Sequence, residues 1–487
     1  MFSKLCMAWV VLGGLVLLGP MAKGQDPSTG PQKPISPVGA EESTSRARQS
    51  DEGTLPAQEP KIIPDARPLA GAQNLALGAI AFNHVFLQPS FNVTTQAERF
   101  PDNSVLANGN NFQYLSYLTG RLGLNRTSGR SELLLDYTAG GTFSNNPIQG
   151  NAAIQNLDFS DTIHWGRWSQ LFGDQFSYLS ESPFGFGGLG GLNNLGIGLG
   201  NGAGGALGPS PSFRADLLPN QTILTVRSPR ISNAVIAQTD YELSRRSSLT
   251  FVGSYGILKF MDGGLQDGRN VLFQAGFNHT LNRKDAVSVQ YRFSEFMFPN
   301  QSERIDDHSM QLTYAKRIAG RLSWQAGAGP EVNVFRTPLA GSSTRVNWTF
   351  SSTLSYQRNV TSVGFNFNRF LSGGSGILQG AQTSQFEGFL NRSLGRNWDT
   401  GLSLGYSRNQ SLQQTTPAAN TISVDTWFAT ARVGRRFGRS GNLFFAYTAQ
   451  KQSNISSVCL LSACGLNTMT HIVSVGYNWG LRPIVIE

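Results

Sequence analysis

The sequence has few charged residues and, beyond its N-terminus, no long apolar run. Only 14% of its 487 residues are Asp, Glu, Lys or Arg, against roughly 25% in an ordinary soluble domain. A membrane-spanning helix needs about 20 consecutive apolar residues, and no segment after residue 24 supplies them. The first shortage argues against an ordinary soluble protein, and the second argues against a helical membrane protein.

Cysteine is also scarce. The chain has 3 Cys, of which Cys6 lies in the N-terminal segment described below. Cys459 and Cys464 remain, and their closeness in an exported chain predicts a small disulfide loop. Two Cys without nearby His make a poor zinc ligand set, so we expect no metal and no other cofactor.

The 5 histidines are widely separated, and no G-x-S-x-G, H-E-x-x-H or Walker pattern occurs. His308 follows Asp306 and Asp307 where a loop is expected, which predicts a solvated cluster; a weak divalent-ion site is the alternative. We therefore predict that the protein is not an enzyme, although a catalytic triad assembled across strands would leave no linear motif.

The N-terminus has the pattern of an export signal. Lys4 precedes the apolar stretch LCMAWVVLGGLVLL, and Ala22-Lys23-Gly24 offers small residues for cleavage before Gln25. We expect a signal peptide over 1–24. Residues 25–75 are rich in Pro, Ser and charge, which predicts a disordered linker. A plain spacer and a tether to a periplasmic partner both remain open for it.

The sequence contains many segments in which apolar and polar residues alternate. In VSVQYRFSEF (287–296), apolar side chains at Val287, Val289 and Tyr291 alternate with Ser288 and polar neighbours. A period of two is the period of a β-strand. The same pattern returns in VLFQAGFNHTL, VNWTFSSTLSYQ, WDTGLSLGYS and THIVSVGYNWG. The chain is therefore predicted to be all-β.

The two faces of these strands differ from those of a soluble sheet. The polar face is Ser, Thr, Asn, Gln and Gly with few charges, and aromatic residues such as Trp348, Tyr406 and Trp479 recur near the ends of the apolar face. Amphipathic rings favour a membrane–water boundary. The pattern indicates lipid outside and water inside, which predicts a closed transmembrane antiparallel up-and-down barrel, since lipid tolerates no unpaired sheet edge.

The spacing of the alternating segments predicts about 18 strands, with 16 as the alternative. We place the barrel over 76–480 and a C-terminal tail over 481–487. The expected strands are 77–91, 112–124, 131–143, 152–164, 167–180, 232–244, 248–260, 270–281, 286–298, 306–318, 321–335, 345–357, 360–371, 384–394, 397–410, 422–436, 441–452 and 468–480. Short connections alternate with longer ones, as expected for periplasmic turns and external loops.

These features resemble the Gram-negative outer-membrane β-barrels of the porin-like type. The strand ending Tyr477-Asn478-Trp479 is similar to the aromatic-ended last strand of that family, although this chain continues through GLRPIVIE. The resemblance implies outer-membrane lipids and the barrel assembly machinery as partners, a location in the outer membrane with the linker in the periplasm, and leaves a homo-oligomer open. The export signal and the lipid-facing strands argue against a nucleic-acid partner, and the Arg residues do not form one stripe interleaved with aromatic residues.

Positive charge gathers at the expected short turns, for example at Arg245 and Arg246. The formal net charge of +9 therefore overstates the charge of the lumen. On the polar faces inside strands we place Gln290, Arg292 and Arg432 as lumen-lining candidates. Glu387 is their expected acidic counterpart. We keep a preference for anions as a hypothesis beside a preference for cations or for neither.

The Gly-rich segment 183–212 has no Lys-Ser or Lys-Thr after it, so a nucleotide site is not expected. A flexible surface loop and an inward loop that narrows the pore both fit it. The main functional hypothesis is a channel for small hydrophilic solutes. The alternative is a structural, adhesive or secretion-associated barrel that displays long surface loops.

Overall fold

The computed structural model describes residues 85–99, 112–145, 150–179, 229–261, 265–299, 303–337, 341–358, 360–412, 423–438, 440–453, 469–481 and 484–486. The expected signal peptide and linker, the segment 183–212, Cys459 and Cys464 lie outside these residues. No helix within the described ranges is long and apolar enough to cross a membrane.

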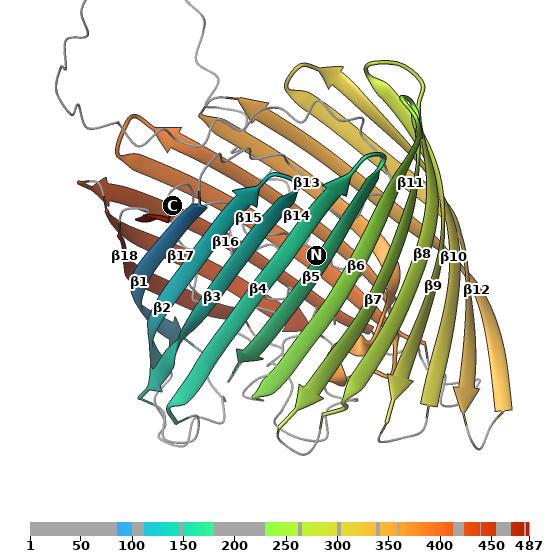
Figure 1. Cartoon of the computed structure of the whole chain (residues 1–487). Coiled ribbons are helices and arrows are strands. Elements are labelled where there is room, and N and C mark those ends of the chain that lie inside the picture. Colours follow the sequence, from blue (N-terminus) through green and yellow to red (C-terminus); the bar gives the residue numbers. More distant parts are fainter. Residues whose placement is uncertain are drawn as a thin grey trace, which may run out of the picture. The chain divides into compact units, whose positions relative to one another are not determined.

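The described chain is almost entirely antiparallel strand (Figure 1). The strands are β1 (Val85–Arg99), β2 (Phe112–Ser128), β3 (Ser131–Ser144), β4 (Ala152–Trp165), β5 (Trp168–Leu179), β6 (Arg230–Ser244), β7 (Ser247–Phe260), β8 (Gly268–Thr280), β9 (Asp285–Phe298), β10 (Glu303–Ala319), β11 (Leu322–Thr337), β12 (Gly341–Arg358), β13 (Thr361–Ser372), β14 (Ala381–Leu394), β15 (Trp398–Ser411), β16 (Ser423–Phe437), β17 (Gly441–Ser453), β18 (Met469–Gly480) and β19 (Ile484–Ile486). The 3₁₀ turn η2 (Gly374–Gly376) lies between β13 and β14.

Each strand from β1 to β18 pairs with its neighbours in sequence, and β1 pairs with β18. Ser90 to Arg99 of β1 run antiparallel to Gly480 to His471 of β18, so the sheet closes. Closure pairs the two edges that would otherwise present unpaired backbone groups to lipid. The prediction of an eighteen-strand barrel is confirmed, and the sixteen-strand alternative is wrong.

The two faces of the barrel are those that the alternation predicts. Phe172, Val235, Phe273 and Val475 point outward and keep 48 to 49% of their surface exposed. Their strand neighbours point inward and are polar and buried, as with Gln274 beside Phe273. An apolar exterior around a polar interior is the surface distribution of an outer-membrane barrel.

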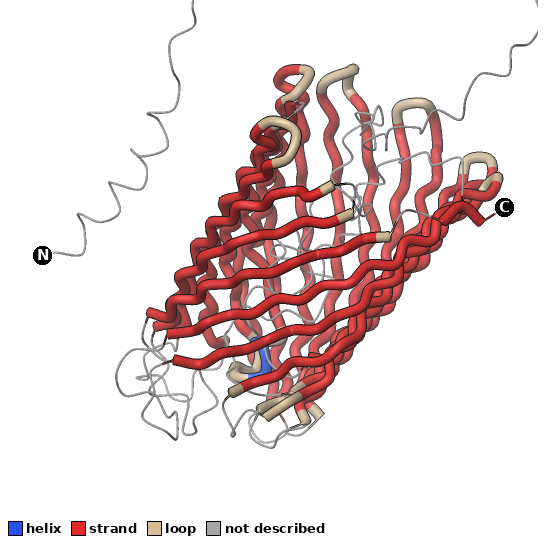
Figure 2. The backbone as a smooth tube through the Cα atoms, turned by 90° about the vertical axis from the view of Figure 1, so that its left-hand side faces the viewer, coloured by secondary structure: helices blue, strands red, loops and turns tan. Residues whose placement is uncertain are grey.

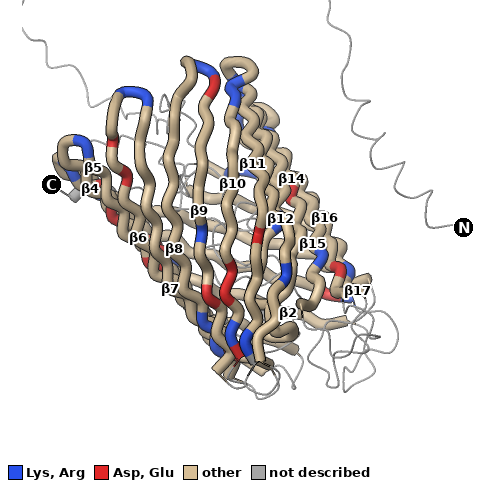
Figure 3. The backbone as a smooth tube through the Cα atoms, turned by 90° about the vertical axis from the view of Figure 1, so that its right-hand side faces the viewer, with Lys and Arg blue, Asp and Glu red and all other residues tan. Residues whose placement is uncertain are grey.

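Tight turns between consecutive strands gather at one end of the barrel (Figure 2). The turn end includes the β4–β5 turn at Gly166 and the β6–β7 turn at Arg245 and Arg246. Figure 3 shows Lys and Arg at these turns, as the sequence predicts. The first described residue, Val85, and the last, Ile486, are paired with each other at this same end.

The first strand differs from its prediction. Of the expected range 77–91, residues 77–84 lie outside the described residues and 85–91 belong to β1, which continues to Arg99. Proline cannot donate a ladder hydrogen bond, and the strand nevertheless continues through Pro89. In the barrel, Pro89 sits where the partner strand is interrupted, between the β18 pairing at Ser90 and the β19 pairing at Leu87. Its carbonyl accepts a hydrogen bond from Leu481 N at 3.0 Å.

Candidate functional site

The inner wall of the barrel is a continuous polar surface. Cross-strand partners share a face, so the register can be followed from strand to strand around the ring. Buried polar side chains at these positions include Asn92, Gln96, Thr119, Ser160, Gln238, Thr250, Gln274, Ser288, Gln311, Thr349, Ser403, Thr430 and Asn478. The seam closes on this face as well, where Asn92 Nδ2 donates to Asn478 Oδ1. The lumen is therefore lined with hydrogen-bonding groups at every sector.

The four candidates from the sequence all lie on this inward face. Gln290 and Arg292 on β9 are buried, and so is Arg432 on β16. Gln290 donates through Nε2 to Gln311 Oε1 at 2.5 Å. Glu387 on β14 is half-buried and accepts a hydrogen bond from Gln385 Nε2 at 2.6 Å.

The acidic partner of Arg292 is Asp307 and not Glu387. Arg292 Nη2 lies 3.5 Å from Asp307 Oδ2 across the β9–β10 ladder, and Asp307 is fully buried. The prediction that Asp306, Asp307 and His308 form a solvated loop cluster is wrong. All three belong to β10, where alternation sends Asp307 into the lumen, while Asp306 and His308 point outward. Asp306 is held there by Arg336 Nη2 at 2.7 Å.

Arg432 packs against an aromatic ring and has an acidic residue nearby. Its guanidinium carbon lies 4.7 Å from the centroid of Phe444 on β17, a cation–π distance. The charge of Asp399 on β15 acts on it from the same inner face. The Asp399 carboxylate covers Gly434, so closely that a Cβ there would lie 2.6 Å from its oxygens. Glycine at this position makes room for the charged group.

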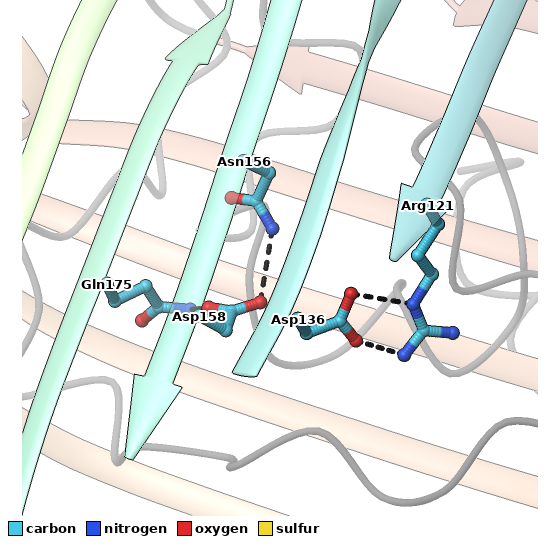
Figure 4. A network of polar contacts seen from close by, with 5 residues as sticks. All are labelled: Arg121, Asp136, Asn156, Asp158 and Gln175. Atoms are coloured by element: carbon cyan, nitrogen blue, oxygen red, sulfur yellow. Dashed lines mark hydrogen bonds and ion pairs between the residues drawn. The ribbon is translucent and has the colours of Figure 1, made fainter. Parts of the chain in front are cut away.

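A second charged network, which the sequence reasoning missed, lies on β2 to β5 (Figure 4). Arg121 donates two hydrogen bonds to the Asp136 carboxylate, from Nε to Oδ1 at 2.6 Å and from Nη2 to Oδ2. Asp158, on the next strand, accepts from Gln175 Nε2 at 2.7 Å and from Asn156 Nδ2 at 3.1 Å. The strand alternation carried the signal, because it already assigns these positions to the polar face.

Acidic residues outnumber basic ones on the inward face of the described strands. The acidic residues are Glu98, Glu132, Asp136, Asp158, Asp240, Glu242, Glu303, Asp307, Glu331, Glu387 and Asp399. The basic residues are Arg121, Arg230, Arg292, Arg317, Arg345, Arg432 and Arg436. The basic character of the whole chain therefore does not extend to the described lumen wall.

The connection between β13 and β14 folds into the lumen. β12 pairs with β13 only between Phe350–Arg369 and Arg358–Thr361, so the last residues of β13 leave the wall. Leu371 at this end packs with Phe298, Ile305 and Phe335, which belong to the inner faces of β9, β10 and β11. Figure 2 shows the short turn η2 within the outline of the barrel.

The turn η2 in this inward segment is also held by contacts at the β7–β8 end of the wall. Gln266 N donates to Gly376 O at 2.8 Å, which ties η2 to the β7–β8 connection. Gly376 has φ +79°, and a Cβ there would overlap the Phe260 ring. Glycine is thus required both for the left-handed backbone and for the close approach. We call the residues from Leu371 to Ala381 the lumen segment. It begins at the end of β13 and reaches the end of β7, where Gly376 meets Phe260.

The base of the lumen segment meets a fully buried carboxylate. Glu331 on β11 faces the Leu371 amide and the Gln382 side chain, although neither carboxylate oxygen completes a hydrogen bond of good geometry. Thr349 Oγ1 donates to Arg369 O at 2.9 Å close by. Each large apolar side chain that is fully buried contributes roughly 1.5 to 3 kcal/mol, so the apolar cluster anchors the segment more strongly than these polar contacts.

These observations decide the architecture. The chain is a closed, eighteen-strand antiparallel β-barrel. It presents apolar side chains on its outer face and encloses a polar, charged interior, which is the distribution expected of a barrel that crosses a membrane. Among the described residues, no three His, Cys, Asp or Glu side chains come together as a metal-binding group.

Comparison with known proteins gives solved structures of similar outline. No protein-family model matches the chain, and no curated protein matches its sequence. OpdQ of Pseudomonas aeruginosa is similar with a TM-score of 0.41 and 8% identity, over 83% of this chain and 100% of that one. OccK2 (OpdF) of the same organism has a TM-score of 0.40 and 10% identity, over 82% and 98%. At these values the likeness is descriptive, and the barrel assignment comes from the closed ladder and its two faces.

Proposed function

We propose that this barrel is an outer-membrane channel through which small hydrophilic solutes diffuse. The observation that carries the proposal is the continuous polar inner wall, with hydrogen-bonding side chains on every strand. Barrels of 16 to 18 strands are wide enough to leave an aqueous path. Buried ion pairs such as Arg292–Asp307 and Arg121–Asp136 add charged groups to this inner wall.

The lumen segment is the selectivity element in this proposal. It brings an apolar cluster and the charged pair Arg292–Asp307 to the same side of the lumen. A solute passing this level meets the partly exposed Phe296, which packs against the buried apolar cluster, and the hydrogen-bonding groups of the polar wall. Such a combination favours small polar molecules over large or fully apolar ones.

The described inner wall favours cations over anions. Acidic side chains outnumber arginines there, and Asp158 and Glu387 hold their carboxylates with neutral amides of Asn and Gln. Those carboxylates that are ionised in such a low-dielectric wall raise the local concentration of cations. The anion hypothesis drawn from the net charge is therefore not the one we propose.

The test is the conductance of the refolded, purified protein in a planar lipid bilayer under a salt gradient. We expect stable unitary steps with a reversal potential of cation sign. A variant in which residues 374–379 are replaced by Gly-Gly should give larger steps. Folding is checked by the heat-dependent shift in gel mobility, which distinguishes an inserted barrel from an unfolded chain.

Silence from protein that is folded and inserted would contradict the channel. The structural, adhesive or secretion-associated barrel would then be the better assignment. Larger steps after removal of the lumen segment, together with an anion-sign reversal potential, would support the channel and contradict only its proposed charge preference.

A further inference from the structure

Three arginines stand in one row on the outer face of β8, β10 and β11, at the end of the barrel opposite the tight turns. Arg269 and Arg304 are both cross-strand partners of Met297 on β9. Arg304 is in turn the direct partner of Arg336. All three arginines are exposed, whereas the next residue of β10, Ile305, points inward and is buried. The register therefore places three positive charges side by side on the lipid-facing side of the wall.

Two carboxylates lie beneath this row, nearer the middle of the wall. Glu295 on β9 and Asp306 on β10 are cross-strand partners. Arg304 Nε lies 2.8 Å from Glu295 Oε1 and 2.9 Å from Asp306 Oδ1. Arg336 Nη2 lies 2.7 Å from Asp306 Oδ2. Figure 3 shows basic and acidic positions together at this end of the barrel. The carboxylates hold both guanidinium groups from one side.

The charge that reaches the surface of this group is positive. The side chains of Asp306 and Glu295 are only 5% and 15% exposed, whereas those of Arg304 and Arg336 are 43% and 59% exposed. Arg269 adds a third exposed positive charge. Like charges directly opposite each other destabilise a ladder. An anion in contact with both Arg304 and Arg336 would therefore stabilise the pair.

The length of β10 places the row at a membrane boundary. Near the tight turns, the outward rings of Tyr314 and Trp324 have centroids 6.3 Å apart, and such amphipathic rings favour the membrane–water interface. Arg304 lies ten residues from Tyr314 on the same strand. At about 3.3 Å per residue and a tilt of about 45°, the separation is about 23 Å, close to the height of about 25 Å of an apolar band. The arginines thus reach the headgroups of the opposite leaflet.

We propose that Arg269, Arg304 and Arg336, called the arginine row below, bind the phosphate groups of a lipid headgroup in this leaflet. Guanidinium groups bind phosphate through paired, charge-assisted hydrogen bonds. Tight turns of outer-membrane barrels face the periplasm, so this leaflet is the outer one. Its lipid in a Gram-negative envelope is a phosphorylated glycolipid, whose charge complements the arginine row.

The wall below the arginine row favours a lipid over a free phosphate ion. Phe273, Met310 and Leu312 point outward there and are 48%, 55% and 62% exposed. The acyl chains of a lipid whose phosphate is held at the arginine row would cover this apolar surface, whereas a phosphate ion would leave it bare. The inference does not depend on the proposed channel, since a barrel closed to solutes would carry the same outer face.

The test is native mass spectrometry of the full-length protein in mild detergent, titrated with lipid A or with dephosphorylated lipid A. The wild type should retain lipid A at least tenfold more tightly than the dephosphorylated lipid. The double variant Arg269→Gln plus Arg336→Gln leaves Arg304 paired with both carboxylates. We expect it to bind lipid A at least tenfold more weakly than the wild type.

The matched control is Arg99→Gln plus Arg408→Gln. These two arginines are also exposed and outward at the same end of the barrel, but they lie on β1 and β15, and neither has an arginine as a cross-strand partner. The control should keep the affinity of the wild type. Both double variants are checked for folding by their heat-dependent gel mobility.

Three outcomes would overturn the proposal. The first is equal retention of lipid A and dephosphorylated lipid A by the wild type, a comparison that needs no variant to fold. The second is an equal loss of affinity in the two double variants, which would indicate a general attraction to positive charge. The third is displacement of lipid A by an equal concentration of inorganic phosphate, which would indicate a site for a free anion.

Discussion

Arg292 and Asp307 face each other across the β9–β10 ladder inside the barrel, with Nη2 3.5 Å from Oδ2. The Arg292 guanidinium therefore lies beside the Asp307 carboxylate on the inner wall, near the lumen segment. A short distance away, Glu331 adds a second carboxylate on β11. The local balance of charge therefore depends on one arginine.

Replacing that arginine should make the channel more cation-selective. In Arg292→Gln, Asp307 and Glu331 lose their nearest positive charge on β9. A wall charge acting on a passing ion in a water-rich lumen is worth about 1 kcal/mol, which corresponds to roughly a fivefold change in the cation-to-anion permeability ratio. The measurement is the reversal potential under a salt gradient. The control is Lys316→Gln, because Lys316 points outward near the turn that follows β10. This substitution should leave the cation-to-anion permeability ratio unchanged.

The Arg121–Asp136 pair should contribute to stability as a unit. Their side chains are 9% and 10% exposed, so removing one partner leaves a nearly buried charge. Arg121→Met or Asp136→Leu alone should cost about 3 to 5 kcal/mol. The double variant should recover a large part of that loss. Urea unfolding followed by tryptophan fluorescence gives the free energy of unfolding of the wild type, the two single variants and the double variant, which together form a double-mutant cycle. Losses in the single variants that add up strictly in the double variant would argue against a coupled pair.

Gly376 should control the position of the lumen segment. Gly376→Val places a side chain where the Phe260 ring now lies and strains a backbone at φ +79°. The segment should move away from β7, and single-channel conductance should rise. Gly395→Val is the matched control, because Gly395 has φ +71° but no atom within 4 Å of its Cβ position. Both variants bear a similar backbone strain of about 1 to 3 kcal/mol, so equal conductance changes in the two would contradict a specific role for the Phe260 contact.

Removal of residues 481–487 should weaken the barrel without opening it. The truncation deletes β19 and its pairing with Val85 to Leu87, while the β1–β18 ladder from Ser90 to Arg99 stays complete. A few ladder hydrogen bonds at about 0.5 to 1.5 kcal/mol each predict a modest fall in the urea midpoint and a normal folded gel mobility. A truncated chain that never reaches the folded mobility would show that β19 takes part in closure.

The barrel could be predicted well from the sequence because its signal is repetitive. Alternation in segments such as 287–296 fixes both the strand and the face of each side chain, so it is sufficient by itself to assign Gln290 and Arg292 to the inward face. The first strand was misplaced because Thr95 and Ala97 weaken the apolar face beyond Pro89.

The arrangement of the lumen could not be predicted in the same way. Asp307 was missed because its acidic neighbours suggested a loop, although the parity of β10 sends it inward. The lumen segment has no period to follow. Its glycines and the apolar Leu378 hint at packing, but the partner surface, with Phe298, Ile305 and Phe335, is assembled from three other strands. Contacts between distant strands are set by closure of the ring and not by local pattern.

The seam between β1 and β18 has a consequence for the timing of assembly. Every other ladder among β1 to β18 joins strands that follow each other in sequence, whereas Asn92 and Asn478 meet across a separation of 386 residues. Hairpins close short loops and can form as the chain emerges, but the seam needs both ends of the barrel at once. Until Asn478 is in place, the sheet has an open edge on β1, so this edge must be kept from pairing with a neighbouring chain until the last strand of the ring has formed.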